Sequence, residues 1–212
     1  MVEKIPKSGY YNTNTFALVT LKAFEEITGR NGVNTILRHA KLPHLINNFP
    51  PHDREKIFDF SEYSAMMQSL EEIYGRRGGR VFALRAGRAT FDELLATYGS
   101  LVGVSDLAFR LIPLKVKVII GINAMAKVFN LVSDQETVVY DRPDYLYYVV
   151  KRCPVCWSRT GEKLPVCFSQ VGLIKEGLHW VSNGQEFDVK EVQCRAMGHE
   201  VCAFEIRKEP IN

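Results

Sequence analysis

The first part of the chain carries apolar residues at the spacing of an amphipathic helix. Between residues 15 and 28 they recur three or four positions apart, which places them on one helix face. They are Phe16, Val19, Ala23, Phe24 and Ile27. Gly29 predicts the end of this helix, because glycine adopts the left-handed conformation of a C-terminal cap at little cost. A second helix is expected to begin at Asn31 or Asn34 and to end before Pro43.

A similar pattern follows a predicted loop at residues 47–53, where two adjacent prolines exclude both helix and regular strand. Ser61 is expected to cap the next helix. The apolar stripe of this helix consists of Tyr63, Met66, Met67, Leu70, Ile73 and Tyr74. Another helix is predicted at about residues 79–98.

Two segments of this helical part resemble each other. Residues 25–32 read EEITGRNG and residues 71–78 read EEIYGRRG, and both place a glycine between two predicted helices. Either two helix–glycine–helix corners converged on one solution, or a helical hairpin was duplicated. The glycines do not form a phosphate-binding loop, because the Gly-Lys-Ser/Thr ending of such a loop is missing.

Residues 114–132 form a nearly continuous apolar run after Pro113, which is favourable in the first turn of a helix. A helix that is apolar on most faces is buried on most faces. Three roles remain open for it, and they can coexist: a central core helix, the wall of a ligand cavity, or a contact with a second subunit.

After Asp134 the pattern changes to β-branched and aromatic residues, which favour strands. The expected elements are strands at 137–140 and 145–150, a helix at 166–182, and strands at 185–194 and 201–206. Helices followed by a β-β-α-β-β unit predict an α+β fold with an antiparallel sheet packed against helices. We expect an N-terminal helical region at residues 1–110 and a ligand-binding region at 111–212, together forming one compact domain.

Composition limits the class of protein. A net charge of +3 without a run of Lys or Arg gives no indication of nucleic-acid binding. The sequence has neither the apolar core of a secretory signal near its start nor an apolar run long enough to span a membrane. We therefore expect a soluble protein of a reducing compartment, the cytoplasm.

The five cysteines all lie in the last third of the chain. They are Cys153, Cys156, Cys167, Cys194 and Cys202. A small secreted protein stapled by disulfides would normally spread an even number of cysteines along its chain. Clustered thiols accompanied by Glu191 and His199 indicate a bound cation, most simply zinc.

Several ligand sets remain open. Glu191 and Cys194 lie three residues apart, and Gly198 permits a reversal that returns Cys202 beside Cys194. Cys167 lies at a predicted helix start, where the helix dipole should lower its pKa. Three thiolates and one carboxylate would fill a tetrahedral structural site. The alternatives recruit Cys153 and Cys156, which form a CxxC pair, or His199, or involve no metal.

These residues resemble a known family. PVCFSQVG at residues 165–172 and EVQCRAMGHEVCAFEI at residues 191–206 are similar to the 4-vinyl reductase (4VR) domain, also called a predicted hydrocarbon-binding domain. The Cys153–Cys156 pair and residues 21–37 resemble further parts of its members. The specific match covers residues 135–208.

The resemblance implies a TRAPP-like fold, often dimeric, so a homodimer is expected. In related phenol-responsive regulators zinc is held by a Cys, a Glu and two Cys, which correspond here to Cys167, Glu191, Cys194 and Cys202, with one extra residue after Cys167. Their apolar pocket would lie between the helix at 113–132 and the strand at 145–150. The pocket residues expected here are Val118, Ile122, Met125, Phe129, Tyr145 and Tyr147. The phenol-gripping region offers Val118 and Leu146 instead of polar groups.

Three functions follow as hypotheses. The first is a module that binds a hydrophobic small molecule, such as a tetrapyrrole, an aromatic or a lipid, beside a structural Zn²⁺ site. The second is an accessory factor or reductase in bacteriochlorophyll vinyl-group reduction, as the family name implies. The sequence shows no nucleotide, flavin or iron–sulfur motif for such a redox reaction, so a binding protein is favoured over an enzyme. The third is a dimeric scaffold or assembly subunit.

Overall fold

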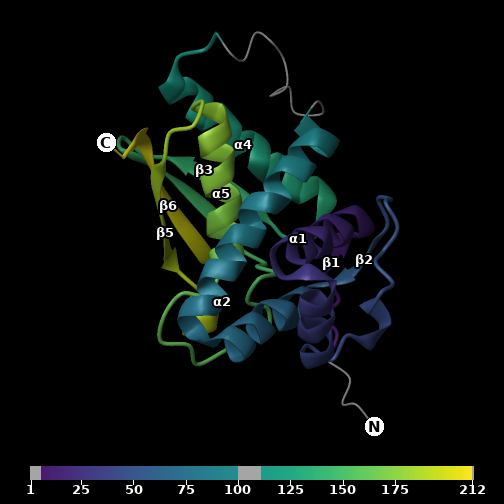
Figure 1. Ribbon diagram of the computed structural model, residues 1–212. Helices are drawn as coiled ribbons and strands as arrows, with labels where there is room; N and C mark the ends of the chain where they lie inside the picture. The colour runs from purple at the N-terminus through teal and green to yellow at the C-terminus, as the bar shows by residue number, and fades with distance from the viewer. Residues whose placement is uncertain (1–5, 100–110, 212) are drawn as a thin grey trace.

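The computed structural model describes residues 6–99 and 111–211. In chain order the elements are β1 (Tyr11–Thr13), α1 (Asn14–His39), β2 (Lys56–Asp59), α2 (Phe60–Tyr98), α4 (Leu114–Val132), β3 (Thr137–Asp141), β4 (Tyr145–Val150), α5 (Phe168–Val181), β5 (Phe187–Gln193) and β6 (Cys202–Pro210), with short 3-10 turns at Pro43–Leu45 and Arg195–Met197. The predicted α+β fold, helices first and then β-β-α-β-β, is confirmed (Figure 1). The predicted division after residue 110 falls at residues 100–110, outside the described ranges.

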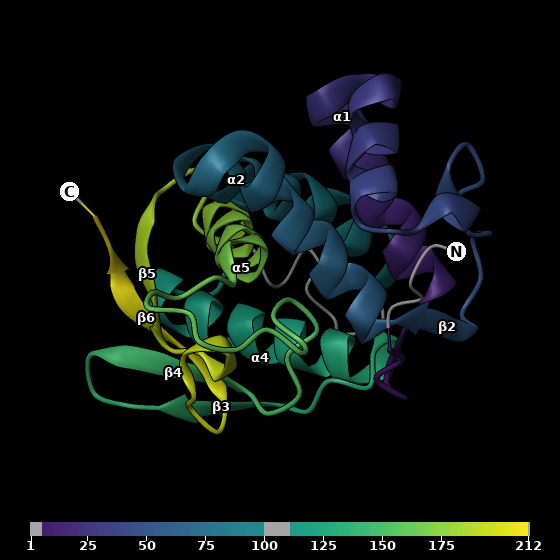
Figure 2. The same ribbon diagram turned by 90° about the horizontal axis from the view of Figure 1, so that it is seen from below.

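The main sheet has the order β3-β4-β6-β5, and every neighbouring pair is antiparallel. Strand alternation turns Leu146, Tyr148 and Val150 of β4 into the core. Helix α5 contacts β5 and α4, and it also packs along α2, which in turn contacts α1. Figure 2 shows α5 between the sheet and α2. The core therefore joins the helical first half to the sheet of the second half.

Both long helices contain the corner that the sequence repeat predicts. Gly29 in α1 has φ 71° and ψ 167°, and Gly75 in α2 has φ 71° and ψ 162°, whereas helical conformation resumes directly after each glycine. A positive φ is costly for any residue with a Cβ. The two EE-I-x-G-R segments thus encode the same kink, which turns each helix without an intervening loop.

The start of α2 corrects the cap expected from the sequence. Asp59, not Ser61, is the N-cap residue: its carboxylate accepts a hydrogen bond from the Ser61 backbone nitrogen at 2.8 Å. The Glu62 carboxylate accepts from the Asp59 backbone nitrogen at 3.2 Å, which completes a capping box. Asp59 also ends β2, which pairs with β1 in a small antiparallel sheet that the sequence pattern did not indicate.

Helices α2 and α5 approach each other through two glycines. A Cβ built on Gly87 would lie 2.0 Å from the Ser169 carbonyl oxygen, and one on Gly172 would lie 2.1 Å from the Leu84 carbonyl oxygen. Only hydrogen atoms fit between the two backbones there. Within the described residues, no helix combines the length and the apolar character needed to cross a bilayer.

Candidate metal centre and apolar cavity

One end of the main sheet gathers the cysteines. Val150 at the end of β4 pairs with Cys202 at the start of β6, and Gln193 at the end of β5 pairs with Ala203. The chain leaving β4 carries Cys153 and Cys156, and Cys194 directly follows β5.

Cys167 caps the start of α5 at the same end of the sheet. All five thiols are buried, and none forms a disulfide. Segments that are far apart in the sequence therefore place their sulfur atoms in one enclosed space.

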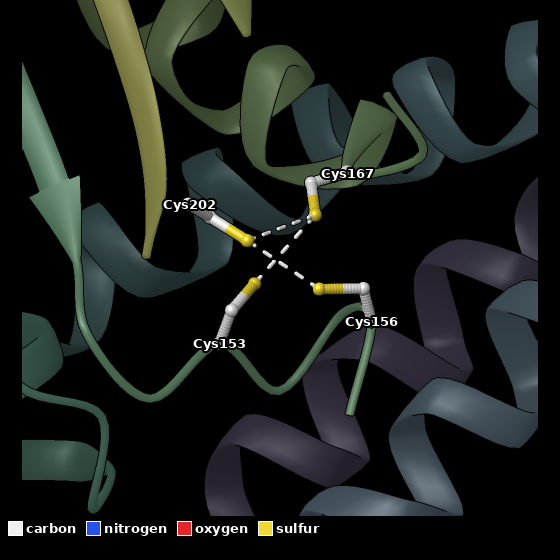
Figure 3. Close-up of side chains that lie close together, drawn as sticks. All are labelled: Cys153, Cys156, Cys167 and Cys202. Carbon is white, nitrogen blue, oxygen red and sulfur yellow. Dashed lines mark hydrogen bonds between the residues drawn. The ribbon is translucent and has the colours of Figure 1, made fainter. Parts of the chain in front are cut away.

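Four of these sulfurs surround a common centre (Figure 3). The Sγ atoms of Cys153 and Cys167 are 3.6 Å apart, those of Cys156 and Cys202 are 3.4 Å apart, and those of Cys167 and Cys202 are 3.8 Å apart. A tetrahedral zinc ion with Zn–S bonds of about 2.3 Å requires sulfur–sulfur edges of about 3.8 Å. The spacing fits a single ion, because sulfurs this close leave no space for the inorganic core of an iron–sulfur cluster.

A second group of four donors shares two members with the first. Cys167, Glu191, Cys194 and Cys202 each offer one ligand atom, and these atoms lie within 4.8 Å of one another. The Sγ atoms of Cys167 and Cys194 are 4.0 Å apart. The two groups meet along the Cys167–Cys202 edge, so the structure brings together both the set implied by the family and the alternative that recruits Cys153 and Cys156.

Glu191 is only half satisfied by hydrogen bonds. Its Oε2 accepts from the Cys167 backbone nitrogen at 2.8 Å, whereas its buried Oε1 has no partner among the described residues. Burial raises the pKa of the Glu191 carboxyl to about 9. A buried oxygen without a partner is costly, so this carboxyl is suited to a cation.

The position of Cys167 at a helix start does not lower its pKa, contrary to the expectation from the sequence. Burial raises the pKa of this thiol, and hydrogen bonding among the neighbouring thiols raises it further. Several anions crowded in an apolar space disfavour one another more strongly than a helix dipole can offset. A metal cation would supply the charge that allows these thiols to ionise.

His199 does not join the cysteine cluster. Its side chain is exposed, and its Nδ1 accepts a hydrogen bond from the Cys194 backbone nitrogen at 3.2 Å. The ring thereby supports the turn that returns β6 beside β5. Neither group of converging donors includes it.

The loop carrying the CxxC pair is anchored to α2 by ion pairs that sequence reasoning missed. The Arg159 side chain is only 5% exposed and donates to Glu71 at 3.0 Å and to Glu162 at 2.7 Å. Arg76, which is 51% exposed, also pairs with Glu162. Glu71 lies in the repeated EE-I-x-G-R segment, but no local pattern indicates its distant partner.

An apolar cavity of about 50 Å³ lies between α2, α4 and α5. Four expected pocket residues line it: Val118, Ile122, Met125 and Phe129. The other walls come from α2 and α5, not from the sheet. They include Phe91, Leu94, Leu95, Leu173, Gly177, Leu178, Trp180 and Val181.

Tyr145 and Tyr147 do not line the cavity. In β4 they alternate with Leu146 and Tyr148, which turn into the core, so the two tyrosines lie on the opposite face of the sheet. The described walls of the cavity are therefore helical, whereas the resemblance placed it between a helix and this strand.

The comparisons with known proteins agree with this architecture. The profile of the 4-vinyl reductase (4VR) domain family matches residues 146–208, which include all five cysteines and Glu191. No curated protein matches the sequence.

Solved H-NOX structures share the fold at low sequence identity. One, reported in a study of heme distortion in the H-NOX family, has a TM-score of 0.60 and 14% identity over 94% of this chain and 97% of the other. The Fe(II) unliganded H-NOX protein from K. algicida has a TM-score of 0.59 and 12% identity over the same shares.

The H-NOX protein from S. oneidensis in its Fe(II)NO state has a TM-score of 0.55 and 13% identity, over 92% of this chain and 98% of that one. At this level of identity the likeness concerns the fold. Because the family profile and the convergence of the cysteines coincide, we conclude that residues 146–208 of this chain form a 4VR domain, the domain that the cysteine motif predicts.

Proposed function

We propose that this protein binds a small apolar molecule between α2, α4 and α5, and that a divalent ion, zinc, stabilises the 4VR domain beside that site. The observation that carries the proposal is the cavity, whose described lining side chains are aliphatic, aromatic or thioether groups. Such a lining favours binding by burial of apolar area, at about 25 cal/mol per Å², and provides few hydrogen bonds to select a polar ligand.

The size of the cavity narrows the class of ligand. One water molecule needs roughly 10–15 Å³ of such space, so a cavity of about 50 Å³ holds a few atoms of that size. A small aromatic ring or a segment of an aliphatic chain fits. Of the ligand classes expected from the sequence, an aromatic or a lipid chain is therefore favoured over a tetrapyrrole.

Heme, the group studied in one of the H-NOX structures that share the fold, does not fit this cavity. The space is much smaller than a porphyrin, and among the described lining residues Met125 alone has an atom able to bind iron axially. The described lining also lacks a titratable side chain that could deliver a proton to a vinyl group. These features support a binding module over a heme sensor or a vinyl reductase.

The metal part of the proposal rests on the sulfur geometry. Cys153, Cys156, Cys167 and Cys202 have the closest sulfur contacts and would fill all four positions of a tetrahedral ion. A filled site leaves no open position for water, so the ion would be structural. It would tie the CxxC loop and the starts of α5 and β6 together.

A pair of matched variants tests the ligand site. Ala124 lines the cavity, whereas Ala96 of α2 is exposed. Ala124→Val adds two methyl groups inside the cavity, and Ala96→Val adds the same groups outside it. Native mass spectrometry of protein from its own host should show a bound apolar molecule in wild type and Ala96→Val but not in Ala124→Val. Titration with toluene as a probe should show the same order, and equal binding by both variants would refute this site.

A further inference from the structure

We propose that the cysteine cluster holds two divalent ions rather than one, bridged by the sulfurs of Cys167 and Cys202. The inference rests on the metal part of the proposed function and extends it. The first ion would lie among Cys153, Cys156, Cys167 and Cys202, and the second among Cys167, Glu191, Cys194 and Cys202.

The number of donors matches two tetrahedra that share an edge. Two four-donor sites with two donors in common need six ligands, and the cluster offers five thiols and one carboxyl. A thiolate sulfur has enough lone pairs to bind two ions at once. The Cys167 and Cys202 sulfurs, 3.8 Å apart, form the shared edge.

The terminal donors arrive in pairs from two different segments. Cys153 and Cys156 come from the loop after β4, whereas Glu191 and Cys194 come from the end of β5. Gly198, with φ 95°, closes the turn that returns the chain from Cys194 to Cys202. Each segment therefore contributes one pair of donors to the shared edge.

A single ion would leave part of the cluster unsatisfied. With one ion among the four closest sulfurs, Cys194 and Glu191 would stay buried beside it without a cation of their own. The Glu191 Oε1 has no hydrogen-bond partner among the described residues, and a buried polar atom in that condition lowers the stability of the fold. A second ion gives this carboxyl and the Cys194 sulfur a common ligand role.

Charge balance points the same way. Fully ionised, the five thiols and the carboxyl carry six negative charges in a space from which water is excluded. One divalent ion offsets two of these charges, and two ions offset four. Each ion bound releases the protons of its thiols to solvent. The Arg195 backbone nitrogen also donates to the Cys202 sulfur at 3.4 Å, which stabilises a negative bridging sulfur.

Metal stoichiometry tests the inference on the intact chain. The protein is saturated with Zn²⁺, desalted and analysed by elemental analysis and native mass spectrometry. Two zinc ions per chain are expected. One ion would overturn this inference but leave the proposed structural site standing, whereas no ion would overturn both.

A matched pair of variants locates the second ion. Glu191 is a proposed ligand, and Glu200, in the following turn, is exposed and belongs to neither group of donors. Glu191→Gln should reduce the content from two ions to one, and Glu200→Gln should retain two. Two ions in both variants would contradict the assignment of Glu191.

The bridge itself has a spectroscopic signature that does not require any variant to fold. In protein loaded with ¹¹³Cd²⁺, two ions that share Cys167 and Cys202 should give two cadmium resonances coupled to each other through the sulfurs. Two resonances without mutual coupling, or a single resonance, would show that no thiolate bridges two ions.

Discussion

Cys167 links the local sequence to the chemistry of the site more directly than any other residue. It is the N-cap residue of α5, its backbone nitrogen donates to Glu191, and its sulfur belongs to both groups of donors. Burial raises its pKa, so the unmetallated cluster favours thiols over thiolates. Its identity as a candidate ligand follows from the motif, but its protonation depends on neighbours that the motif does not place.

Removing the metal should therefore cost stability at Cys167. An ion at 1,000 times its dissociation constant stabilises the folded form by about 4 kcal/mol. We expect a chelator to lower the Tm of the wild type, and Cys167→Ser to lower it by a similar amount with little further effect of the chelator. Differential scanning calorimetry measures both. A wild type whose Tm ignores the chelator would contradict a structural ion.

Arg159 should contribute far more to stability than Arg76, although both pair with Glu162. Removing one member of a buried ion pair leaves uncompensated charges and costs about 3–5 kcal/mol, whereas an exposed pair contributes roughly 0–1 kcal/mol. Arg159→Ala should lower the free energy of unfolding by about 3 kcal/mol and Arg76→Ala by less than about 1 kcal/mol. Urea denaturation of the two variants provides the comparison, and equal losses would show that the Arg159 network is not buried in solution.

Among the elements, α2 and α5 owe their close packing to glycine. The repeated EE-I-x-G-R segments predicted the corners at Gly29 and Gly75 because a glycine between two helical patterns is a local signal. Gly87 and Gly172 lie inside helices, where nothing local distinguishes them. Their role is visible only from the carbonyl oxygens of the facing helix.

The effect of Gly87→Ala should have the opposite sign to that expected from helix propensity. Alanine is favoured over glycine inside a helix by about 1 kcal/mol, but here its Cβ would lie 2.0 Å from the Ser169 carbonyl oxygen. We expect a destabilisation of about 2 kcal/mol or more, because backbone must move to relieve the contact. The midpoint of chemical denaturation reports it. A stabilised variant would mean that α2 and α5 lie farther apart.

In the molecule as a whole, α5 connects the two sites. Cys167 caps its start, and its residues from Leu173 to Val181 contribute to the cavity. Helix α2 borders the same region through Glu71, the partner of Arg159, at one end and through Phe91 farther along. Neither site is confined to the 4VR segment, since part of the cavity wall comes from the helical first half.

This arrangement predicts that metal and apolar ligand bind cooperatively. Removing zinc should free the start of α5 and weaken toluene binding several-fold, and toluene should strengthen zinc retention by the same factor, because linkage is reciprocal. Calorimetric titrations with and without zinc, at a temperature where both forms are folded, measure this coupling. Ala124→Val should lose toluene binding and keep its zinc. Identical toluene affinities in the two forms would exclude the coupling.

The homodimer expected from the family resemblance stays a prediction. The apolar helix α4 exposes Val116, Ile120 and Leu131, whereas its other side lines the cavity. Ile120→Glu should therefore disrupt a dimer built on this face without reaching the cavity. Sedimentation velocity at several concentrations distinguishes the two states, and a wild type that stays monomeric throughout would exclude the dimer.

Local patterns were sufficient for the helices of the first half, the two glycine corners, the strand order of the second half and the residues of the metal cluster. Each depends on periodicity, on a residue with unusual backbone freedom, or on cysteines with few alternative uses. The pairing of β1 with β2, the Asp59 cap, the Glu71–Arg159 ion pair and the true cavity walls arise between segments distant in the chain. Which sulfurs share an edge is of the same kind, because a ligand set is defined by distances between atoms, and those distances exist only once the sheet and α5 have packed.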